Sequence, residues 1–257
     1  MEFIDTHTHI FLEQFDEDRE DVISRAVERG VKTMLLPNID HSTFSRMIKC
    51  EQEYPLYTKS MIGLHPCSVN EGVEDELLFV ENELGRGNYC AIGETGIDLY
   101  WDKSFVSKQI YSFTKHVRWA IEYDLPLVIH ARDSFQEIFQ VIEQENDERL
   151  KGVFHCFTGG AEEAKKILSF GGFKMGLGGV LTYKNSGVAE TVKNIDLSHF
   201  VIETDAPYLS PTPLRSKRNE PSHLTYIAEK LAEVKALKID NIAEVTTENA
   251  IKLFKLT

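Results

Sequence analysis

Residues 89–130, YCAIGETGIDLYWDKSFVSKQIYSFTKHVRWAIEYDLPLVIH, contain one complete strand–helix–strand pattern. The apolar runs at residues 89–93 and 125–130 are short and contain β-branched and aromatic residues, which favours strands over buried helices. Between them, apolar side chains from residue 106 to residue 121 recur at helical spacing and form one stripe. Strands that alternate with helices are typical of βαβ units, so this stretch predicts a parallel sheet covered by helices.

The same alternation extends to both ends of the chain. Further strand-like runs lie at residues 3–7, 31–37, 57–64, 152–157, 173–181 and 200–204. Helical stripes recur at residues 22–27, 224–231 and 242–254, and Gly30 stands where the first of these helices would end. Eight such units in 257 residues predict an α/β fold of the (β/α)8 TIM-barrel type, with one domain over residues 1–257. The alternative is an open doubly wound sheet, but no GxGxxG motif follows the first run.

The charge of the chain excludes some classes of protein. There are 28 Lys and Arg residues against 41 Asp and Glu residues, a net charge of −13. This balance argues against binding of nucleic acid through a broad basic face and against binding to anionic membranes. The sequence has neither a signal-peptide pattern nor a long apolar run, and its four cysteines form no CxxC motif. We therefore expect a cytoplasmic monomer with reduced thiols, no membrane contact and one local binding site.

Side chains that bind metals follow several of the predicted strands. In barrels of this type the active site lies at the C-terminal ends of the strands. The side chains at those ends are His7, His9, Glu94, His130, His155 and Asp205. Each one alone is more often structural, but imidazoles and carboxylates gathered at one rim suit one or two divalent ions with a bound water. The sequence therefore predicts a metal site at this rim.

These residues belong to motifs that resemble the TatD family of metal-dependent hydrolases, the TatD-type deoxyribonucleases with an amidohydrolase-like barrel. The motifs are DTHTH at residues 5–9, GLHP at 63–66, GETGID at 93–98, HARD at 130–133, FHCFTG at 154–159, ETDAPYL at 203–209, RSKRNEP at 215–221 and TEN at 247–249. They follow one another along the whole chain. Two departures concern the substrate side, because Ser216 replaces a common Gly and Cys67 replaces a common His.

The resemblance implies two divalent ions as cofactors. It places His7, His9 and Asp205 on one ion, His130 and His155 on the other, and Glu94 between them. The ions could be Zn, Mn, Mg or Co. Imidazole ligands favour Zn, Mn, Fe or Co over Mg, because Mg prefers an all-oxygen shell. Family nucleases are commonly regarded as Mg-dependent, so the metal stays open at this point.

The resemblance also implies an activity, the hydrolysis of DNA phosphodiester bonds by a water that the two ions activate. Single-stranded DNA or DNA ends are the expected substrate. We expect Asp205 to orient the water and to accept its proton, with Glu94 as the second catalytic residue. The alternative for Asp205 is a metal ligand without a role in proton transfer.

Basic residues near the same rim are candidates for substrate binding. Arg132 follows the fifth predicted strand, and a guanidinium binds phosphate with two hydrogen bonds; its alternative is a structural ion pair. Arg215, Lys217 and Arg218 form a basic cluster after the eighth strand that could bind a phosphate backbone or could simply be solvated. His65 ends the third strand and is expected to contact the substrate or to support a metal ligand.

Two other functions fit the same pattern of residues. The barrel and its ions could activate water against a carbonyl group, in an amide, a lactone or an ester. Arg132 and the basic cluster favour a phosphate over a carbonyl substrate. A non-enzymatic binding protein on an inactivated barrel is disfavoured, because no ligand implied by the resemblance is missing from the sequence.

Overall fold

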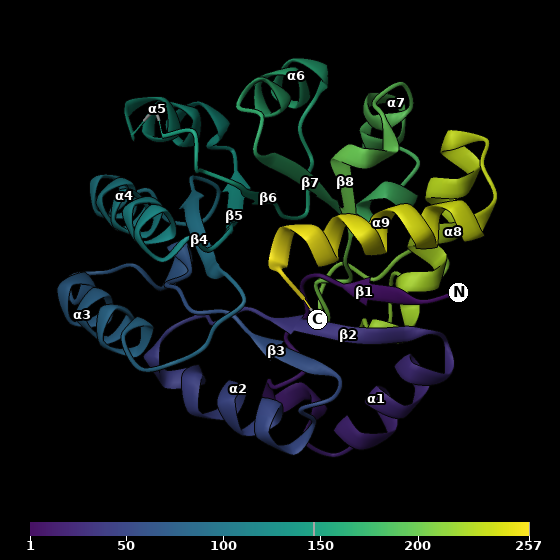
Figure 1. Cartoon of the computed structure of the whole chain (residues 1–257), viewed down its shortest axis with the longest axis horizontal. Coiled ribbons are helices and arrows are strands. Elements are labelled where there is room, and N and C mark those ends of the chain that lie inside the picture. The colour runs from purple at the N-terminus through teal and green to yellow at the C-terminus, as the bar shows by residue number, and fades with distance from the viewer. Residues whose placement is uncertain (146, 257) are drawn as a thin grey trace.

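The computed structural model describes residues 1–145 and 147–256, with strands at its centre and helices around them (Figure 1). The described strands are β1 (Phe3–Asp5), β2 (Val31–Leu36), β3 (Thr58–Ser60), β4 (Ile92–Asp98), β5 (Leu127–Arg132), β6 (Gly152–Phe154), β7 (Phe173–Leu177) and β8 (Phe200–Ile202). They neighbour one another in sequence order, and their paired neighbours run parallel. This is the arrangement that the alternating pattern predicts.

Hydrogen bonds beyond the strand ends close the strands into a barrel. The strands form two sheets, β1–β3 and β4–β8. On one side, Ile62 after β3 pairs with Ile92 at the start of β4. On the other side, Thr8 after β1 pairs with Ala206 after β8, so the first and last strands meet. The predicted (β/α)8 barrel is therefore confirmed.

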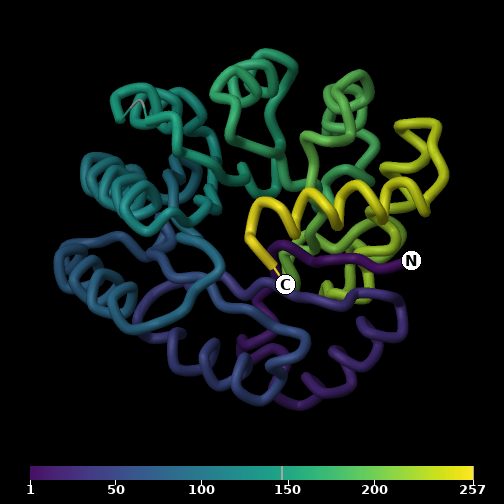
Figure 2. Tube along the Cα trace, viewed as in Figure 1, coloured from purple at the N-terminus to yellow at the C-terminus, as the bar shows by residue number. Residues whose placement is uncertain are grey.

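Helices cover the outside of the barrel (Figures 1 and 2). They are α1 (Arg19–Glu28), α2 (His41–Glu53), α3 (Val73–Leu84), α4 (Val106–Tyr123), α5 (Phe135–Glu145), α6 (Ala161–Ser169), α7 (Val188–Val192), α8 (Leu224–Lys235) and α9 (Ile239–Phe254). Short 3-10 turns are η1 (Glu13–Phe15), η2 (Pro66–Ser68), η3 (Gly179–Thr182), η4 (Leu197–His199) and η5 (Pro221–His223). The four predicted helices lie within α1, α4, α8 and α9, and Gly30 follows α1 with φ at 90°.

The last helix, α9, covers the N-terminal mouth of the barrel. Asn249 donates a hydrogen bond to the carbonyl of Phe200, at the start of β8, and the Thr247 hydroxyl donates to the carbonyl of Glu2, just before β1. Apolar side chains from inside the barrel and from α9 form one buried cluster, with Ile4, Leu35, Met61, Ala91, Val128, Val153, Val201, Ala250, Leu253 and Phe254. Because α9 closes this mouth, the cavity of the barrel opens at the C-terminal ends of the strands.

The fourth strand lies further along the chain than the sequence predicts. We expected a strand over residues 89–93 with Glu94 at its end, whereas β4 begins at Ile92, contains Glu94 and ends at Asp98. The apolar pattern breaks at Glu94, yet this carboxylate is buried inside the barrel. A charged residue that serves a site therefore interrupts the pattern without ending the strand. In contrast, β1, β3, β6, β7 and β8 are shorter than the predicted runs.

Two simpler expectations concern the membrane and the thiols. Within residues 1–145 and 147–256, no helix combines the length and hydropathy that a membrane span requires. The four cysteines are free thiols, as their spacing predicts, and Cys50 is buried while Cys67 is exposed.

Candidate metal centre

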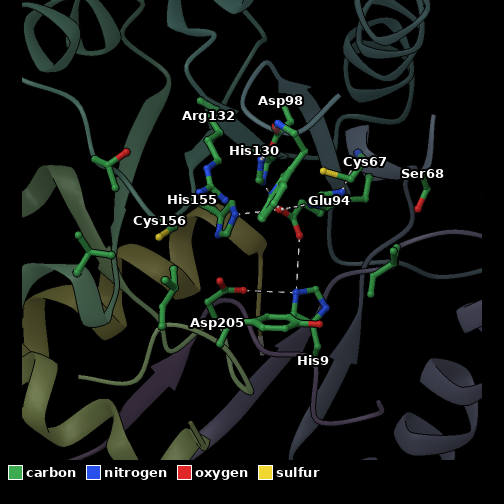
Figure 3. Close-up of a pocket in the computed structure, with 18 residues that line it drawn as sticks. His9, Cys67, Ser68, Glu94, Asp98, His130, Arg132, His155, Cys156 and Asp205 are labelled. Carbon is green, nitrogen blue, oxygen red and sulfur yellow. Dashed lines mark hydrogen bonds and ion pairs between the residues drawn. The ribbon is translucent and has the colours of Figure 1, made fainter. Parts of the chain in front are cut away.

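A cavity of about 680 Å³ opens at the C-terminal ends of the strands (Figure 3). Side chains from well-separated parts of the chain line it, including His9, His65, Glu94, His130, Arg132, His155 and Asp205. His7 is fully buried and stacks on the ring of His155, with 3.9 Å between the centroids. The structure thus brings together the imidazoles and carboxylates that the sequence places at strand ends.

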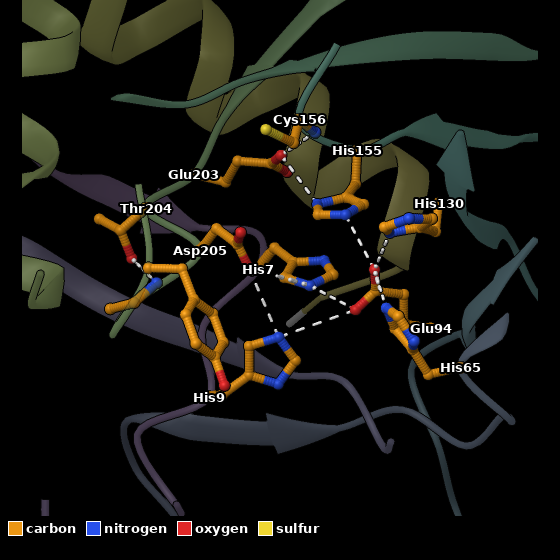
Figure 4. Close-up of polar contacts among 12 residues, drawn as sticks. His7, His9, His65, Glu94, His130, His155, Cys156, Glu203, Thr204 and Asp205 are labelled. Carbon is orange, nitrogen blue, oxygen red and sulfur yellow. Dashed lines mark hydrogen bonds and ion pairs between the residues drawn. The ribbon is translucent and has the colours of Figure 1, made fainter. Parts of the chain in front are cut away.

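One side of the cluster combines two imidazoles and two carboxylates (Figure 4). The Oε2 atom of Glu94 lies 3.0 Å from Nε2 of His7 and 3.7 Å from Nε2 of His9. The Oδ1 atom of Asp205 lies 3.7 Å and 3.5 Å from the same two nitrogens. These four groups therefore face one small buried volume.

The other oxygen of Glu94 faces a second group of imidazoles. Its Oε1 atom lies 2.9 Å from Nδ1 of His130 and 2.9 Å from Nε2 of His155. The Nε2 atom of His65 is 3.4 Å away from the same oxygen. The two oxygens of one carboxylate therefore divide the histidines into two sets, and Glu94 lies between them.

Asp98 holds His130 from the side opposite Glu94. Its Oδ2 atom lies 2.8 Å from Nε2 of His130, while its Oδ1 atom accepts hydrogen bonds from the amides of Tyr100 and Trp101. A carboxylate on the second nitrogen of an imidazole orients the ring and selects its tautomer. Asp98 was not among the predicted site residues. Its spacing of four from Glu94 places both side chains on one face of an extended strand, a signal that could have identified it.

Glu203 supports His155 in a similar way and was also missed. Its Oε1 atom lies 3.3 Å from Nδ1 of His155 and accepts a hydrogen bond from the amide of Cys156. The hydroxyl of Thr6 donates to the other oxygen at 3.3 Å. Glu203 is fully buried, so it acts as an anchor beneath the cluster. Its position two residues before Asp205 was the available signal.

The charges of the cluster favour ionised carboxylates. Burial opposes ionisation of Glu94, but the charges of the surrounding imidazoles, His155 foremost, hold its pKa well below its usual range. Burial likewise opposes ionisation of Asp205. A hydrogen bond from His9 and the charges of the neighbouring imidazoles outweigh burial, so the pKa of Asp205 is lowered. Buried anions require nearby positive charge. Bound cations supply that charge when the imidazoles are neutral ligands.

The donor atoms fit divalent cations. The ligand atoms of His7, His9 and Glu94 all lie within 4.8 Å of one another, and so do those of His65, Glu94 and His130. Imidazole nitrogens with carboxylate oxygens are typical ligands of Zn and its neighbours in the first transition row. These residues could therefore hold metal ions on both sides of Glu94.

Backbone geometry places two of these groups. Asp205 has φ at 57°, a left-handed conformation that Asp adopts more readily than most residues, and its amide donates to the His7 carbonyl at 2.8 Å. Gly96 has φ at 141° and passes β5 so closely that a Cβ atom would lie 2.1 Å from the carbonyl oxygen of His130. Close contact between β4 and β5 therefore keeps Glu94 and His130 side by side.

Among the basic residues, Arg132 reaches the cavity. It ends β5, and its guanidinium carbon lies 3.8 Å from the centroid of the Tyr100 ring. Within the described residues Arg132 forms no ion pair, whereas Arg218 pairs with Asp18. The charge of Arg132 is therefore available to an anion in the cavity.

The three basic residues after β8 make different contacts. Arg218 donates hydrogen bonds to both carboxylate oxygens of Asp18, so its charge is paired at the protein surface. Arg215 lies over the ring of Tyr183 at 4.1 Å and lines a neighbouring hollow. Lys217 is exposed on the same loop. Within the described residues, Arg218 therefore forms an ion pair, whereas Arg215 and Lys217 form none.

Comparison with known proteins places this site in a family. The sequence model of the protein family described as TatD related DNase matches residues 4–255. The chain belongs to the TatD family. It is 38% identical over 253 residues to the uncharacterised metal-dependent hydrolase YabD of Bacillus subtilis (strain 168), with 98% of each chain covered. The resemblance inferred from the motifs is thus confirmed, and this TatD-family protein is a metal-dependent hydrolase.

Two further relatives extend the comparison. The crystal structure of YjjV, a TatD homologue from Escherichia coli K12, superposes with a TM-score of 0.93 at 27% identity and covers 99% of this chain and 98% of that chain. A protein of Pantoea ananatis (strain LMG 20103) is 32% identical over 249 residues, with 95% of each chain covered. That protein is named the 3'-5' ssDNA/RNA exonuclease TatD.

Proposed function

We propose that this TatD-family hydrolase cleaves phosphodiester bonds in DNA, at single-stranded regions or ends. The observation that carries the proposal is the position of Arg132. Its guanidinium pairs with no carboxylate among the described residues and lies on the wall of the same cavity as Glu94 and Asp205. A cation beside a metal cluster suits a phosphate better than an uncharged carbonyl group. The name of the Pantoea ananatis relative supports the same class of substrate.

The proposal assigns two metal sites. His7, His9 and Asp205 would hold one divalent ion, His130 and His155 the other, and Glu94 would bridge them. Bound ions of this kind lower the pKa of a coordinated water and offset negative charge on a phosphate. The arrangement of imidazoles around the two oxygens of Glu94 supports this assignment.

The chain supplies the remaining functions. Asp205 carries a carboxylate of lowered pKa at the edge of the cluster, where it can orient a water and accept its proton. Arg132 would bind a non-bridging oxygen of the phosphate. His65, whose Nε2 atom lies 3.4 Å from Oε1 of Glu94, would contact the substrate or support the second site. Arg218 forms an ion pair with Asp18, so the proposed contacts to phosphate rest chiefly on Arg132. Arg215 and Lys217 would contact phosphates further along the bound DNA strand.

The first test determines which metal the enzyme requires and which class of substrate it cleaves. The protein is stripped with a chelator and then given Mg, Mn, Co or Zn separately. Single-stranded DNA, a chromogenic phosphodiester, an ester and a lactone are assayed side by side. We expect metal-dependent cleavage of the two phosphodiesters. Turnover of the ester or lactone without phosphodiester cleavage under any metal would overturn the proposal in favour of carbonyl hydrolysis.

A substitution tests the role of Arg132 within this reaction. Arg132→Ala should lower kcat/KM for DNA by roughly 10- to 100-fold, since a hydrogen bond to a charged group contributes about 1.5–3 kcal/mol. Arg29→Ala removes an exposed arginine next to α1, far from the cavity, and should leave the rate unchanged. Equal rates for the two variants would remove Arg132 from the proposed site.

A further inference from the structure

Two aromatic side chains stand exposed at the mouth of the cavity. Tyr100 and Trp101 follow β4 after one intervening residue, Leu99, and their exposed fractions are 53% and 69%. Trp101 lines the cavity together with Arg132. A large exposed aromatic surface on a protein commonly marks a binding site. Within the described residues, the cluster of histidines and carboxylates around Glu94 makes no hydrogen bond with either aromatic ring, so the pair needs a separate explanation.

We propose that Trp101, Tyr100 and Arg132 form a stacking platform for an unpaired nucleobase beside the phosphate that is cleaved. The inference rests on the proposed nucleic-acid function and adds to it the feature of the substrate that is recognised. The bound group would be a flat base that has left its own stack, at a single-stranded end or in a single strand.

The geometry of the platform supports a flat ligand. The guanidinium carbon of Arg132 lies 3.8 Å from the centroid of the Tyr100 ring and 5.4 Å from that of Trp101. The two aromatic rings are 4.9 Å apart and perpendicular to each other. Tyr100 therefore holds the guanidinium in place, while the highly exposed indole of Trp101 keeps surface free for a partner.

A single carboxylate joins this platform to the metal cluster. Asp98 accepts hydrogen bonds from the amides of Tyr100 and Trp101, at 2.9 and 3.1 Å, through Oδ1. Its other oxygen lies 2.8 Å from His130. A base stacked on Trp101 would therefore be held at a constant distance from the reacting centre. This is what a site that cleaves one chosen bond requires.

The charge of the chain adds a second argument for stacking. With a net charge of −13, the protein repels a polyanion at long range. Affinity for a nucleic acid must therefore come from local contacts, and stacking on an aromatic ring depends neither on a basic surface nor on sequence. Bases inside a duplex cannot offer their faces, so the platform would select unpaired nucleotides.

The first experiment removes the base rather than the phosphate. Single-stranded oligonucleotides carry an abasic residue at one of the terminal three positions of either end, and cleavage is compared with the intact oligonucleotide. We expect the wild-type enzyme to lose roughly 10-fold in kcat/KM, mostly through KM, for one of these positions. Trp101→Ala should show the same loss on the intact oligonucleotide and no further loss on the abasic one. Tyr123→Ala, an exposed tyrosine on α4, serves as the matched control.

The second experiment measures binding without turnover. The chain has two tryptophans, and Trp119 is buried, so quenching of exposed indole fluorescence reports on Trp101. In chelator-treated protein, a short oligothymidylate should quench this signal, and an abasic oligomer of equal length should not. Trp101→Phe should abolish the quenching.

The outcomes separate the two proposals. If wild type cleaves DNA but treats intact and abasic ends alike, and Trp101→Ala cleaves at the wild-type rate, the platform is wrong and the nuclease function stands. If wild type cleaves no phosphodiester under any metal and no oligonucleotide quenches the indole, both proposals fail.

Discussion

Glu94 is the residue on which the candidate site depends most. It is buried, and imidazoles approach both of its oxygens. Few arrangements other than metal binding give a single carboxylate this many histidine neighbours. Its role can therefore be tested through metal content as well as through rate.

Replacing the charge of Glu94 should disrupt metal binding. Glu94→Gln keeps the shape of the side chain but removes the anion that would bridge the two ions. We expect at least one equivalent of metal to be lost, and kcat to fall by about 100-fold or more, because such ions supply several kcal/mol of charge stabilisation. Elemental analysis and an assay on single-stranded DNA measure the two effects. Glu248→Gln on the exposed face of α9 is the control, and full metal content in Glu94→Gln would rule out the bridging role.

Asp98 offers a milder test of how the cluster is supported. In Asp98→Asn, the side-chain oxygen can still accept from the amides of Tyr100 and Trp101, but an amide group now faces His130. We expect metal affinity to fall by roughly 10- to 100-fold, the usual effect of losing such a supporting carboxylate. Competition with a chelator gives the affinity. Asp102→Asn, in the exposed loop that follows, should leave it unchanged.

At this scale the sequence predicted the residues that converge and missed those that support them. Histidines at strand ends stand out because imidazole is rare and binds metals. Asp98 forms a hydrogen bond with His130, and Glu203 lies 3.3 Å from Nδ1 of His155. Such contacts depend on side-chain positions that spacing alone does not determine. Trp101 was missed for a related reason, because an aromatic residue after a strand is more often buried than exposed.

At the scale of the elements, the pairing of β4 with β5 carries the site. Gly96 pairs with His130 in this register, and its backbone leaves no room for a side chain. Gly96→Ala would force a Cβ atom against the His130 carbonyl and also place Ala at positive φ. We expect a loss of several kcal/mol in unfolding free energy, measured by urea denaturation, and weaker metal binding. Gly171→Ala, also at positive φ but with open space around it, is the control for backbone strain alone.

The helix α4 contains a buried histidine that should give the protein a pH-dependent stability. His116 accepts a hydrogen bond from the amide of Leu64 and lies 2.7 Å from the carbonyl of Ser112, and burial lowers its pKa to about 4. The unfolded chain, with an ordinary histidine pKa of 6.5, then binds the proton more readily. The contribution of His116 to the unfolding free energy is therefore fully present above pH 6.5. It is lost as the pH drops toward 4, and the loss amounts to roughly 3 kcal/mol at most.

The prediction for His116 is checked by substitution. His116→Gln should remove most of this slope from unfolding free energies measured between pH 4 and pH 7 in chelator-treated protein. Wild type and variant are compared under identical conditions, so that the contribution of the histidines and carboxylates around Glu94 cancels in the difference between the two unfolding free energies. Parallel curves for the two proteins would contradict the assignment.

The elements themselves were largely predictable, because apolar periodicity follows from which faces are buried. The prediction failed where burial serves the site instead of the core. Glu94 and Asp98 lie within β4. A prediction that ends the strand at the first charged residue therefore places it too early in the chain. Similarly, the predicted run at residues 173–181 covers β7 and extends into the 3-10 turn η3, because apolar content does not show where a strand ends.

For the whole molecule, the net charge of −13 sets the expected response to salt. Arg132 and one neighbouring cation would contact one or two phosphates. The logarithm of kcat/KM for a single-stranded oligonucleotide should then fall with the logarithm of salt concentration with a slope of about −1, given about 0.7 per contact. Retention of blunt duplex DNA in gel-shift assays should be negligible. A slope near −5 would instead indicate an extended basic binding track.

The contact that closes the barrel has a consequence for how the enzyme is made. His7 and His9 flank Thr8, which pairs with Ala206, the neighbour of Asp205. A ribosome therefore delivers the two imidazoles some two hundred residues before the carboxylate. A nascent or truncated chain that stops before this point lacks one side of the cluster. The enzyme thus completes its candidate metal centre only when the segment that carries Asp205 has emerged and paired with the segment that carries His7 and His9.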